Sequence, residues 1–189
     1  VYLASGEQSP SMEVAEAVLP VGVRQKPARW FLALKHACDL GLAAALTPVL
    51  LAVCACVVVL NPVLNPGPLI FSQVRVGRHG RHFRMYKLRT MTGSGGDPRF
   101  ATAETHRITP FGRFLRAKRI DELPQIVNVL KGEMSFIGPR PEQPRFFAEF
   151  ATTIPGYVTR QMVRPGISGL AQVEAGYADS RDRTRAKLR

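Results

Sequence analysis

One long segment without a charged residue constrains the fold of this chain more than any other feature. Residues 40–60 read LGLAAALTPVLLAVCACVVVL, which is 21 residues. A straight helix of that length covers about 30 Å, the thickness of the hydrocarbon layer of a bilayer. A cleaved signal peptide fits poorly, because the segment begins at residue 40 and no small-residue cleavage site follows it. The segment predicts a helix inserted in a membrane, since a buried helix of a soluble protein would be unusually long and uniformly apolar.

Both flanks of this segment are basic. Arg24, Lys26, Arg29, Lys35 and His36 precede it, and Arg75, Arg78, Arg81, Arg84, Lys87 and Arg89 follow it. Since basic flanks stay on the cytoplasmic side, both ends are expected there. Pro48 removes a helical hydrogen bond near the centre, and the hydroxyl of Thr47 is available to a freed carbonyl. A helix broken at Thr47-Pro48 that returns to the face it entered reconciles these signals, and a kinked spanning helix is the alternative.

These features predict an α+β monotopic membrane protein in three parts. We expect a mobile N-terminal tail over 1–28, a re-entrant membrane helix over 29–60 and a small cytoplasmic catalytic domain of helices and short strands over 61–189. In that domain the residue pattern predicts strands at 69–76 and 83–88 joined by a glycine-containing turn, and a short helix at 145–150. Residues 92–99 are expected to form a flexible loop, and residues 164–173 a turn followed by a short strand.

The composition points to an anionic partner. The chain carries 26 lysines and arginines against 14 acidic residues, a formal net charge of +12. Such an excess suits nucleic acid, phospholipid headgroups or phosphorylated substrates, and charge alone does not choose among them. Cys38, Cys54 and Cys56 have no metal-binding spacing, so three reduced thiols are expected. The four histidines have no consistent spacing and are assigned neither to a metal nor to catalysis.

Residues 113–142 contain the most closely spaced candidate catalytic residues, an adjacent Asp121-Glu122 pair that follows a run of cations. The run consists of Arg113, Arg116, Lys118 and Arg119. An amphipathic helix is predicted after Asp121, with its apolar stripe formed by Leu123, Ile126, Val127 and Leu130 and its end at Gly132. Pro124 is tolerated in the first turn of this helix, where no backbone donor is needed, and Asp121 is expected to be its N-cap.

Asp121, Gln125 and Asn128 are expected to share the polar face of that helix. A carboxylate pair beside a helix N-terminus and several arginines suits the handling of phosphate. The alternative is an N-cap next to a solvated basic face.

Several blocks in order resemble one family, the bacterial sugar transferases, also called monotopic phosphoglycosyl transferases. KHACDLGLAAALTPVLL is similar to the family's Lys-x-x-x-Asp start of a broken membrane helix. NPGPLIFSQVRVGRHGRHFRMYKLRTM is similar to its GP-x-x-F-x-Q-x-R-x-G…K-x-R-[ST]-M block. RITPFGRFLRAKRIDELPQIVNVLKGEMSFIGPRPE resembles its catalytic centre, and RPGISGLAQV its late motif. The resemblance covers residues 35 to 175.

The resemblance implies transfer of a sugar-1-phosphate from a nucleotide diphosphate sugar, expected to be a UDP-sugar, to a polyprenol phosphate such as undecaprenyl phosphate. Asp121 would be the nucleophile and a contact of Mg²⁺, and Glu122 would assist the transfer or help to place the metal. By position the resemblance implies substrate-binding roles for Lys87, Arg89, Arg116, Gln125, Arg140 and Arg164. It further implies a place on the cytoplasmic face of the bacterial inner membrane, in exopolysaccharide, O-antigen, capsule or glycoconjugate synthesis.

Each of these roles has a structural alternative. Lys87 and Arg89 alternate with Tyr86 and Leu88, as they would on the solvent face of a strand. Arg164 precedes a proline and could fix the direction of a turn, while Gln125 and Asn128 could bridge backbone groups.

The chain departs from the family pattern in places. Ala-Lys-Arg-Ile stands before Asp121 where small hydroxyl residues are common, and Thr105-His106 stands where an acidic residue often precedes Arg107. The chain also ends at Arg189, where family members usually continue.

A membrane-anchored basic protein that binds acidic lipid or nucleic acid without catalysis is the rival function. It accounts for the charge and the apolar segment but gives no reason for the Asp121-Glu122 pair inside a cationic motif. The expected partners are therefore a nucleotide sugar, polyprenol phosphate and membrane lipid, and not nucleic acid.

Overall fold

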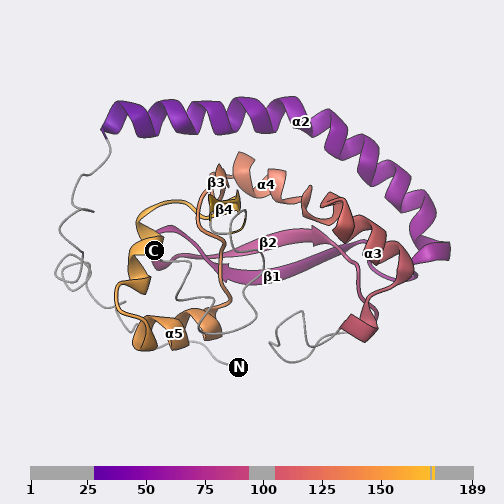
Figure 1. The fold of residues 1–189 in the computed structure, drawn as a ribbon. Helices are drawn as coiled ribbons and strands as arrows, with labels where there is room; N and C mark the ends of the chain where they lie inside the picture. The colour runs from indigo at the N-terminus through magenta and orange to yellow at the C-terminus, as the bar shows by residue number, and fades with distance from the viewer. Residues whose placement is uncertain (1–27, 94–104, 171, 173–189) are drawn as a thin grey trace, which may run out of the picture.

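The computed structural model describes residues 28–93, 105–170 and 172. One long helix, α2 (Arg29–Leu64), lies across a body of short helices and small sheets (Figure 1). The strands β1 (Ile70–Val76) and β2 (His82–Leu88) pair antiparallel, and β3 (Ser135–Ile137) and β4 (Gly166–Ser168) pair in parallel. This mixture of helices and strands confirms the α+β class. The predicted tail, most of the 92–99 loop and the final charged segment lie outside the described residues.

The other elements of the body are short. They are η2 (Arg78–Gly80), α3 (Pro110–Ala117), η4 (Ile120–Glu122), α4 (Gln125–Leu130), α5 (Pro144–Thr153) and η5 (Tyr157–Met162). The predicted strands are confirmed to within one residue at their first positions, and the predicted short helix is confirmed and extends to Thr153. The strand predicted late in the chain is β4, which begins directly after Pro165.

The helix α2 is continuous, with Pro48 and Pro62 inside it. It bends over the body below (Figure 1), as proline-containing helices do. The hydroxyl of Thr47 donates to the carbonyl of Ala43 at 2.8 Å. The carbonyl that loses its donor at Pro48 is that of Ala44, four residues earlier, so the expected compensation by Thr47 is wrong. The interruption expected at Thr47-Pro48 is a bend inside one helix, and this helix ends at Leu64 instead of residue 60.

A narrow seam of α2 packs against the body. Ala43, Leu50 and Val57 are 0%, 6% and 5% exposed and follow one another in seven-residue steps, which keep side chains on one face. The first two belong to a core cluster with Phe83, Met85, Ile126, Val129 and Met134. Val57 packs with Leu88 and Leu115 in a second cluster. The seam therefore touches the body over most of its length.

The outer face of α2 is apolar and exposed. Val59 and Val63 are 75% and 82% exposed, and Trp30, Phe31, Leu51 and Val58 are also exposed. The stretch Trp30–Leu64 is long and apolar enough to cross a membrane. An apolar surface of this extent indicates contact with lipid or protein, because its exposure to water is energetically unfavourable.

Polar contacts fix the first part of α2 to the body. Lys35 donates to the carboxylate of Asp39 at 3.0 Å and also to the hydroxyl of Ser135. The backbone N–H of Phe136 donates to the other oxygen of Asp39 at 3.3 Å. The charged groups of Lys35 and Asp39 on the apolar helix thus find hydrogen-bond partners on the surface of the body.

The end of α2 is fixed to the same body. The side chain of Asn65 donates to the carbonyl of Arg89 at 2.8 Å. Arg89 in turn donates to four backbone carbonyls, those of Asn65, Pro66, Pro68 and Met91. Both ends of the apolar helix therefore rest on one polar body.

The segment around the acidic pair differs from the predicted helix. Asp121 and Glu122 lie in the 3₁₀ turn η4, and α4 begins only at Gln125. Pro124 has no N–H to continue a helical ladder, and Leu123 bonds back to Ile120 in the tighter 3₁₀ pattern. The expectation that Asp121 caps the helix is wrong, since Pro124 holds that position and no side chain caps it.

The polar side of α4 is buried. Gln125 and Asn128 are 1% and 0% exposed. Asn128 accepts from the N–H of Tyr86 at 3.2 Å and donates to the carbonyl of Arg84 and to Glu133, each at 2.7 Å. It therefore completes the edge of β2 that β1 leaves unpaired, in place of a further strand.

Replacing Asn128 should destabilise the protein. Asn128→Ala leaves a buried N–H and a buried carbonyl of β2 without partners, and each such group costs about 1–3 kcal/mol. We expect the melting temperature in detergent to fall by roughly 5–10 °C. Lys131→Ala, at an exposed position one turn later, is the control and should change it little. Equal melting temperatures for the two variants would contradict the role given to Asn128.

Candidate active site

The centre of the site is an ion-pair cluster that joins separate segments. Lys87 of β2 lies 2.9 Å from Oε1 of Glu122 in η4, and Arg140, in the loop after β3, lies 3.1 Å from the same oxygen. Arg119 approaches this oxygen at 3.8 Å. The Glu122 side chain is 7% exposed and that of Lys87 17%, so neither belongs to a solvated strand or helix face.

The cluster keeps Glu122 ionised. Burial raises the pKa of this carboxyl group, but the charges and hydrogen bonds of Lys87 and Arg140 outweigh burial and hold the pKa below its ordinary value. Burial lowers the pKa of Lys87, and the nearby Arg140 lowers it further, whereas Glu122 raises it. Glu122 is thus an ionised carboxylate that is paired with its cationic partners.

Asp121 has a different environment. It is 7% exposed, and its Oδ1 is buried with no hydrogen-bond partner in the part of the chain that the structure describes. Burial raises the pKa of Asp121 and the adjacent Glu122 adds to this, while Lys87, Arg116 and Arg119 partly offset it. One oxygen of the pair is therefore buried and has no partner among the described residues, and such a group marks a candidate contact for a metal or a substrate.

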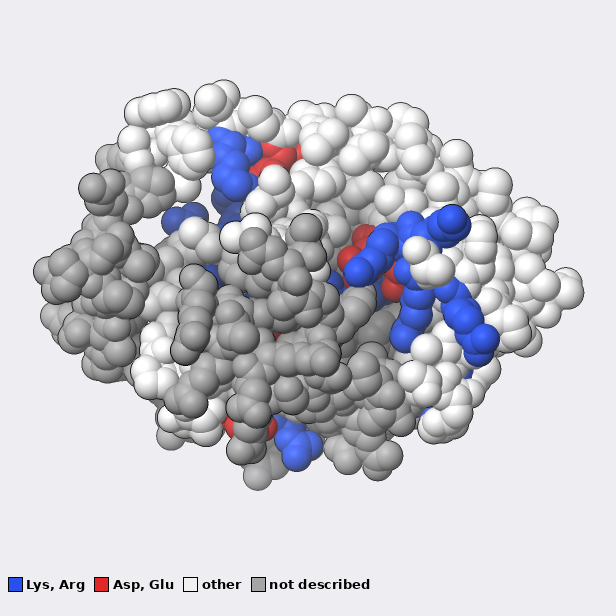
Figure 2. Space-filling model, viewed as in Figure 1, with Lys and Arg blue, Asp and Glu red and all other residues white. Residues whose placement is uncertain are grey.

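Basic side chains surround the acidic pair. Figure 2 shows Lys and Arg gathered around acidic atoms in the region of α3 and η4. In this region Arg113, Lys118 and Arg119 are exposed, and Arg116 donates from Nε to the hydroxyl of Thr90 at 2.8 Å. This bond orients Arg116 from the end of β2. Arg119 has φ 58°, a left-handed conformation that is uncommon outside glycine.

Gln125 adds a second unengaged group near the pair. It follows Asp121 by four residues, and its Nε2 is buried with no partner among the described residues. A buried amide donor without an acceptor is costly in a finished core, so it marks a place where a ligand oxygen is expected.

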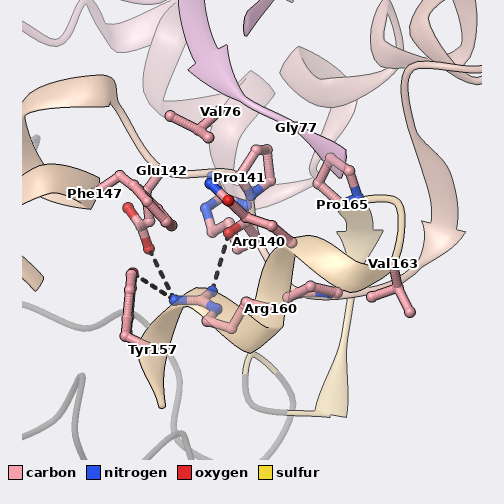
Figure 3. Close-up of a pocket in the computed structure, with 12 residues that line it drawn as sticks. Val76, Gly77, Arg140, Pro141, Glu142, Phe147, Tyr157, Arg160, Val163 and Pro165 are labelled. Atoms are coloured by element: carbon pink, nitrogen blue, oxygen red, sulfur yellow. Dashed lines mark hydrogen bonds and ion pairs between the residues drawn. The ribbon is translucent and has the colours of Figure 1, made fainter. Parts of the chain in front are cut away.

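The loop that carries Arg140 is held from behind. Figure 3 shows Arg160 between Tyr157, Glu142 and the backbone of Arg140. Arg160 donates to the Tyr157 hydroxyl at 2.6 Å and to the Arg140 carbonyl at 3.0 Å. The hollow drawn there has room for little more than one water molecule. The hollow is too small for a substrate, and the contacts around it support the Arg140 loop.

A half-buried arginine that the sequence reasoning missed supports the same loop. Arg75 of β1 donates to the carbonyl of Pro141 at 3.1 Å, and the N–H of Val76 donates to the carbonyl of Glu142 at 2.9 Å. Burial lowers the pKa of Arg75 to about 10. The signal was present in the F-x-Q-x-R block, where Gln73 accepts from Arg75 at 2.6 Å.

Two of the predicted substrate-binding arginines contact backbone. Arg89 donates to the four carbonyls named above, which fixes the end of α2. Arg164 donates from Nε to the carbonyl of Gly132 at 2.9 Å and ties the start of β4 to the end of α4. The structure therefore brings Lys87, Arg116 and Arg140 to the acidic pair and gives Arg89 and Arg164 structural contacts.

A larger cleft opens beside Glu122. It has a volume of about 400 Å³ and is lined by Leu46, Arg119, Glu122, Leu123, Ile126, Phe136, Ile167, Ser168 and Gln172. It lies between α2, η4, α4 and the two strands of the parallel sheet. Its volume falls in the range of ligand sites in proteins.

The residues present fit one mode of magnesium binding, in which the substrate supplies part of the ligands. No cluster of three or more His, Cys, Asp or Glu side chains able to hold a metal occurs within residues 28–93, 105–170 and 172. Mg²⁺ commonly binds through one or two carboxylates together with substrate phosphates and water. The unengaged Oδ1 of Asp121 suits that mode, with the phosphates supplying the remaining ligands.

Comparison with known proteins gives a consistent family. The family model described as bacterial sugar transferase matches residues 30–189. An Aeromonas hydrophila protein, UDP-N-acetylgalactosamine-undecaprenyl-phosphate N-acetylgalactosaminephosphotransferase, is 52% identical over 126 residues, 66% of this chain and 30% of that protein. The Klebsiella pneumoniae UDP-glucose:undecaprenyl-phosphate glucose-1-phosphate transferase is 41% identical over 130 residues, 68% of this chain and 27% of that protein.

A Bacillus subtilis protein, provisionally named an undecaprenyl-phosphate N-acetylgalactosaminyl 1-phosphate transferase, is 43% identical over 138 residues, 72% of this chain and 76% of that protein. The chain thus spans less than a third of the Aeromonas and Klebsiella relatives and most of the Bacillus one. The family match extends from the start of α2 to the last residue and includes the acidic pair with its cations. The chain belongs to the bacterial sugar transferase family.

Proposed function

We propose that this protein transfers a sugar-1-phosphate from a nucleotide diphosphate sugar to a polyprenyl phosphate through a covalent intermediate on Asp121. The observation that carries the proposal is the division of roles within the acidic pair. Glu122 is ion-paired to Lys87 and Arg140, whereas Oδ1 of Asp121 is buried and has no partner among the described residues. The names of the relatives, which combine UDP-sugars with undecaprenyl phosphate, support this choice of substrates.

In the first half-reaction a carboxylate oxygen of Asp121 attacks the β-phosphorus of the nucleotide sugar. A new O–P bond forms, the bond from phosphorus to the bridging oxygen breaks, and the nucleoside monophosphate leaves with the electron pair. Arg116 and Arg140 neutralise charge that develops on the phosphoryl oxygens. The unengaged amide of Gln125 donates to one of these oxygens.

In the second half-reaction a phosphate oxygen of the lipid attacks the same phosphorus. The bond to Asp121 breaks, the carboxylate is restored, and the product is a polyprenyl diphosphate sugar. Splitting the transfer into two displacements separates the encounters with two anionic substrates. Mg²⁺, when bound through Asp121 and the substrate phosphates, would withdraw charge from the phosphoryl group.

The contacts of α2 support a particular membrane arrangement. Lys35 and Asp39 near its start and Asn65 at its end all bind the polar body that carries the acidic pair. A helix that spans the bilayer would place these contacts on opposite sides of the hydrocarbon. We therefore propose that α2 enters and leaves on one face, the cytoplasmic face of the bacterial inner membrane, with its outer side in lipid.

Release of nucleoside monophosphate tests the function. The protein in detergent should release UMP from at least one member of a panel of UDP-sugars, only with Mg²⁺, and faster when undecaprenyl phosphate is added. Asp121→Asn should lower the rate by about a thousandfold or more, because no other group can replace the nucleophile. Glu122→Gln should lower it by about ten- to a hundredfold, because Lys87 and Arg140 lose their common partner.

Glu149→Gln, on α5 outside the site, is the matched control and should keep the wild-type rate. Wild-type protein that releases no nucleoside monophosphate from any donor would contradict the proposed activity. Steeply salt-dependent nucleic-acid binding in such an inactive protein would favour the rival function.

Cysteine labelling tests the membrane arrangement. Cys38, Cys54 and Cys56 are replaced, and single cysteines are placed at the exposed positions Ala28 and Thr92. An impermeant maleimide should label both positions in inverted vesicles and neither in right-side-out vesicles. Pro48→Ala restores a helical hydrogen bond and should increase labelling of position 28 from the opposite side. Wild-type protein with one position reactive from each side would establish a spanning helix.

A further inference from the structure

We infer that the cleft beside Glu122 binds the phosphate end and the first isoprene units of the polyprenyl phosphate acceptor. This inference rests on the proposed function and adds the place where the lipid substrate meets the site. The lipid is the occupant of the cleft, and the experiment below distinguishes it from the nucleotide sugar.

The walls of the cleft suit a branched hydrocarbon. Five of its lining side chains are apolar: Leu46, Leu123, Ile126, Phe136 and Ile167. Four of these five, all except Ile126, are only partly buried although they pack against the main core cluster, so they present apolar surface to the cleft. A ribose or a hexose would leave its hydroxyl groups without partners along such walls.

Arg119 makes the polar end of the cleft suitable for a phosphate, because the ionised Glu122 beside it is already paired with Lys87 and Arg140. Glu122 and Arg119 line it, together with Ser168 and Gln172. Arg119 is about half exposed and lies 3.8 Å from Glu122, next in sequence to the segment that carries Asp121. A phosphate held by this guanidinium would lie at the edge of the acidic pair, where the second displacement needs its attacking oxygen.

The position of the cleft suits a substrate that arrives from the bilayer. Leu46 brings the helix α2 into its wall. Leu42 and Val49, one turn to either side of Leu46, are 48% and 51% exposed on the apolar outer surface of this helix. A lipid chain lying along that surface therefore reaches the cleft without crossing water.

The volume sets how much of the chain fits. At about 30 Å³ for each water-sized group, 400 Å³ holds about a dozen non-hydrogen atoms, which is a phosphate group and roughly one to two isoprene units. The remainder of a long polyprenyl chain would stay in the bilayer.

Filling the cleft tests the inference. Ile167→Trp places a large ring in its wall, and Ile137→Trp is the matched control, because Ile137 lies on the paired strand β3 and is 69% exposed. The probes are a UDP-sugar that the wild type uses, undecaprenyl phosphate in detergent, and a water-soluble isoprenyl phosphate of three units. For Ile167→Trp we expect the KM for both acceptors to rise at least tenfold. The burst of nucleoside monophosphate formed without acceptor should stay near the wild-type amplitude.

Three results would overturn the inference. An unchanged acceptor KM in Ile167→Trp would show that the lipid binds elsewhere. A raised KM for the UDP-sugar in the burst would assign the cleft to the donor. An equal rise in Ile137→Trp would indicate a general effect on the sheet.

A second variant covers the case in which Ile167→Trp fails to fold and gives no burst. Leu46→Trp changes the wall from the side of α2, outside the catalytic body, and should give the same rise in the acceptor KM. A wild-type protein with no burst at all would contradict the proposed function. That result differs from the three above, which concern the cleft alone.

Discussion

The rest of the site depends on one buried charge cluster, in which Glu122 accepts from Lys87 and Arg140. These residues come from β2, η4 and the loop after β3, so the pairing fixes the relative positions of three segments. Removing charges from water is expensive unless they are paired, and here a single carboxylate satisfies two cations. Because Glu122 takes up these partners, the adjacent Asp121 keeps an oxygen that is buried and unengaged. A difference of one position along the chain thus separates a carboxylate that anchors two cations from the carboxylate that we propose as the nucleophile. Arg75 and Arg160 extend the anchoring, since both bind the backbone of the loop that carries Arg140.

In the proposed arrangement, the helix α2 joins this site to the membrane. Its seam of Ala43, Leu50 and Val57 packs on the same core that positions β2 and α4. Its remaining surface is apolar and exposed, so one helix both packs on the body and presents the surface that we propose to lie in lipid. The polar contacts at its ends set its orientation, Lys35 and Asp39 with Ser135 and Phe136 at one end and Asn65 with Arg89 at the other. The Arg89 that family motifs pointed to as a substrate contact therefore has a structural role at the point where α2 meets the body.

The sequence predicts those parts of the structure that local patterns control. The apolar segment, the two strands around residue 80 and the helix after Pro144 follow from hydropathy, alternation and proline placement, and the structure confirms them. The 3₁₀ turn at Asp121 was missed, because the apolar spacing of Leu123 to Leu130 indicated one helix and gave too little weight to the missing N–H of Pro124. Asn128 was expected on a polar face, with the bridging of backbone groups as the alternative, and the structure confirms the bridging. Helical spacing does not reveal that the bridged groups belong to the edge of β2. The cleft beside Glu122 was also beyond prediction, since its walls come from residues 46 to 172 and meet only in the folded chain.

The most direct test of the account is the intact mass of the protein after incubation with a nucleotide sugar and Mg²⁺ in the absence of any lipid acceptor. The division between Asp121 and Glu122 predicts a gain in mass of one sugar phosphate, located by peptide mapping on Asp121 and lost when polyprenyl phosphate is added. Glu122→Gln should still acquire the adduct, more slowly, and Asp121→Asn should acquire none. An adduct that persists in Asp121→Asn, or a wild-type protein that turns over substrate without ever carrying an adduct, would contradict the account.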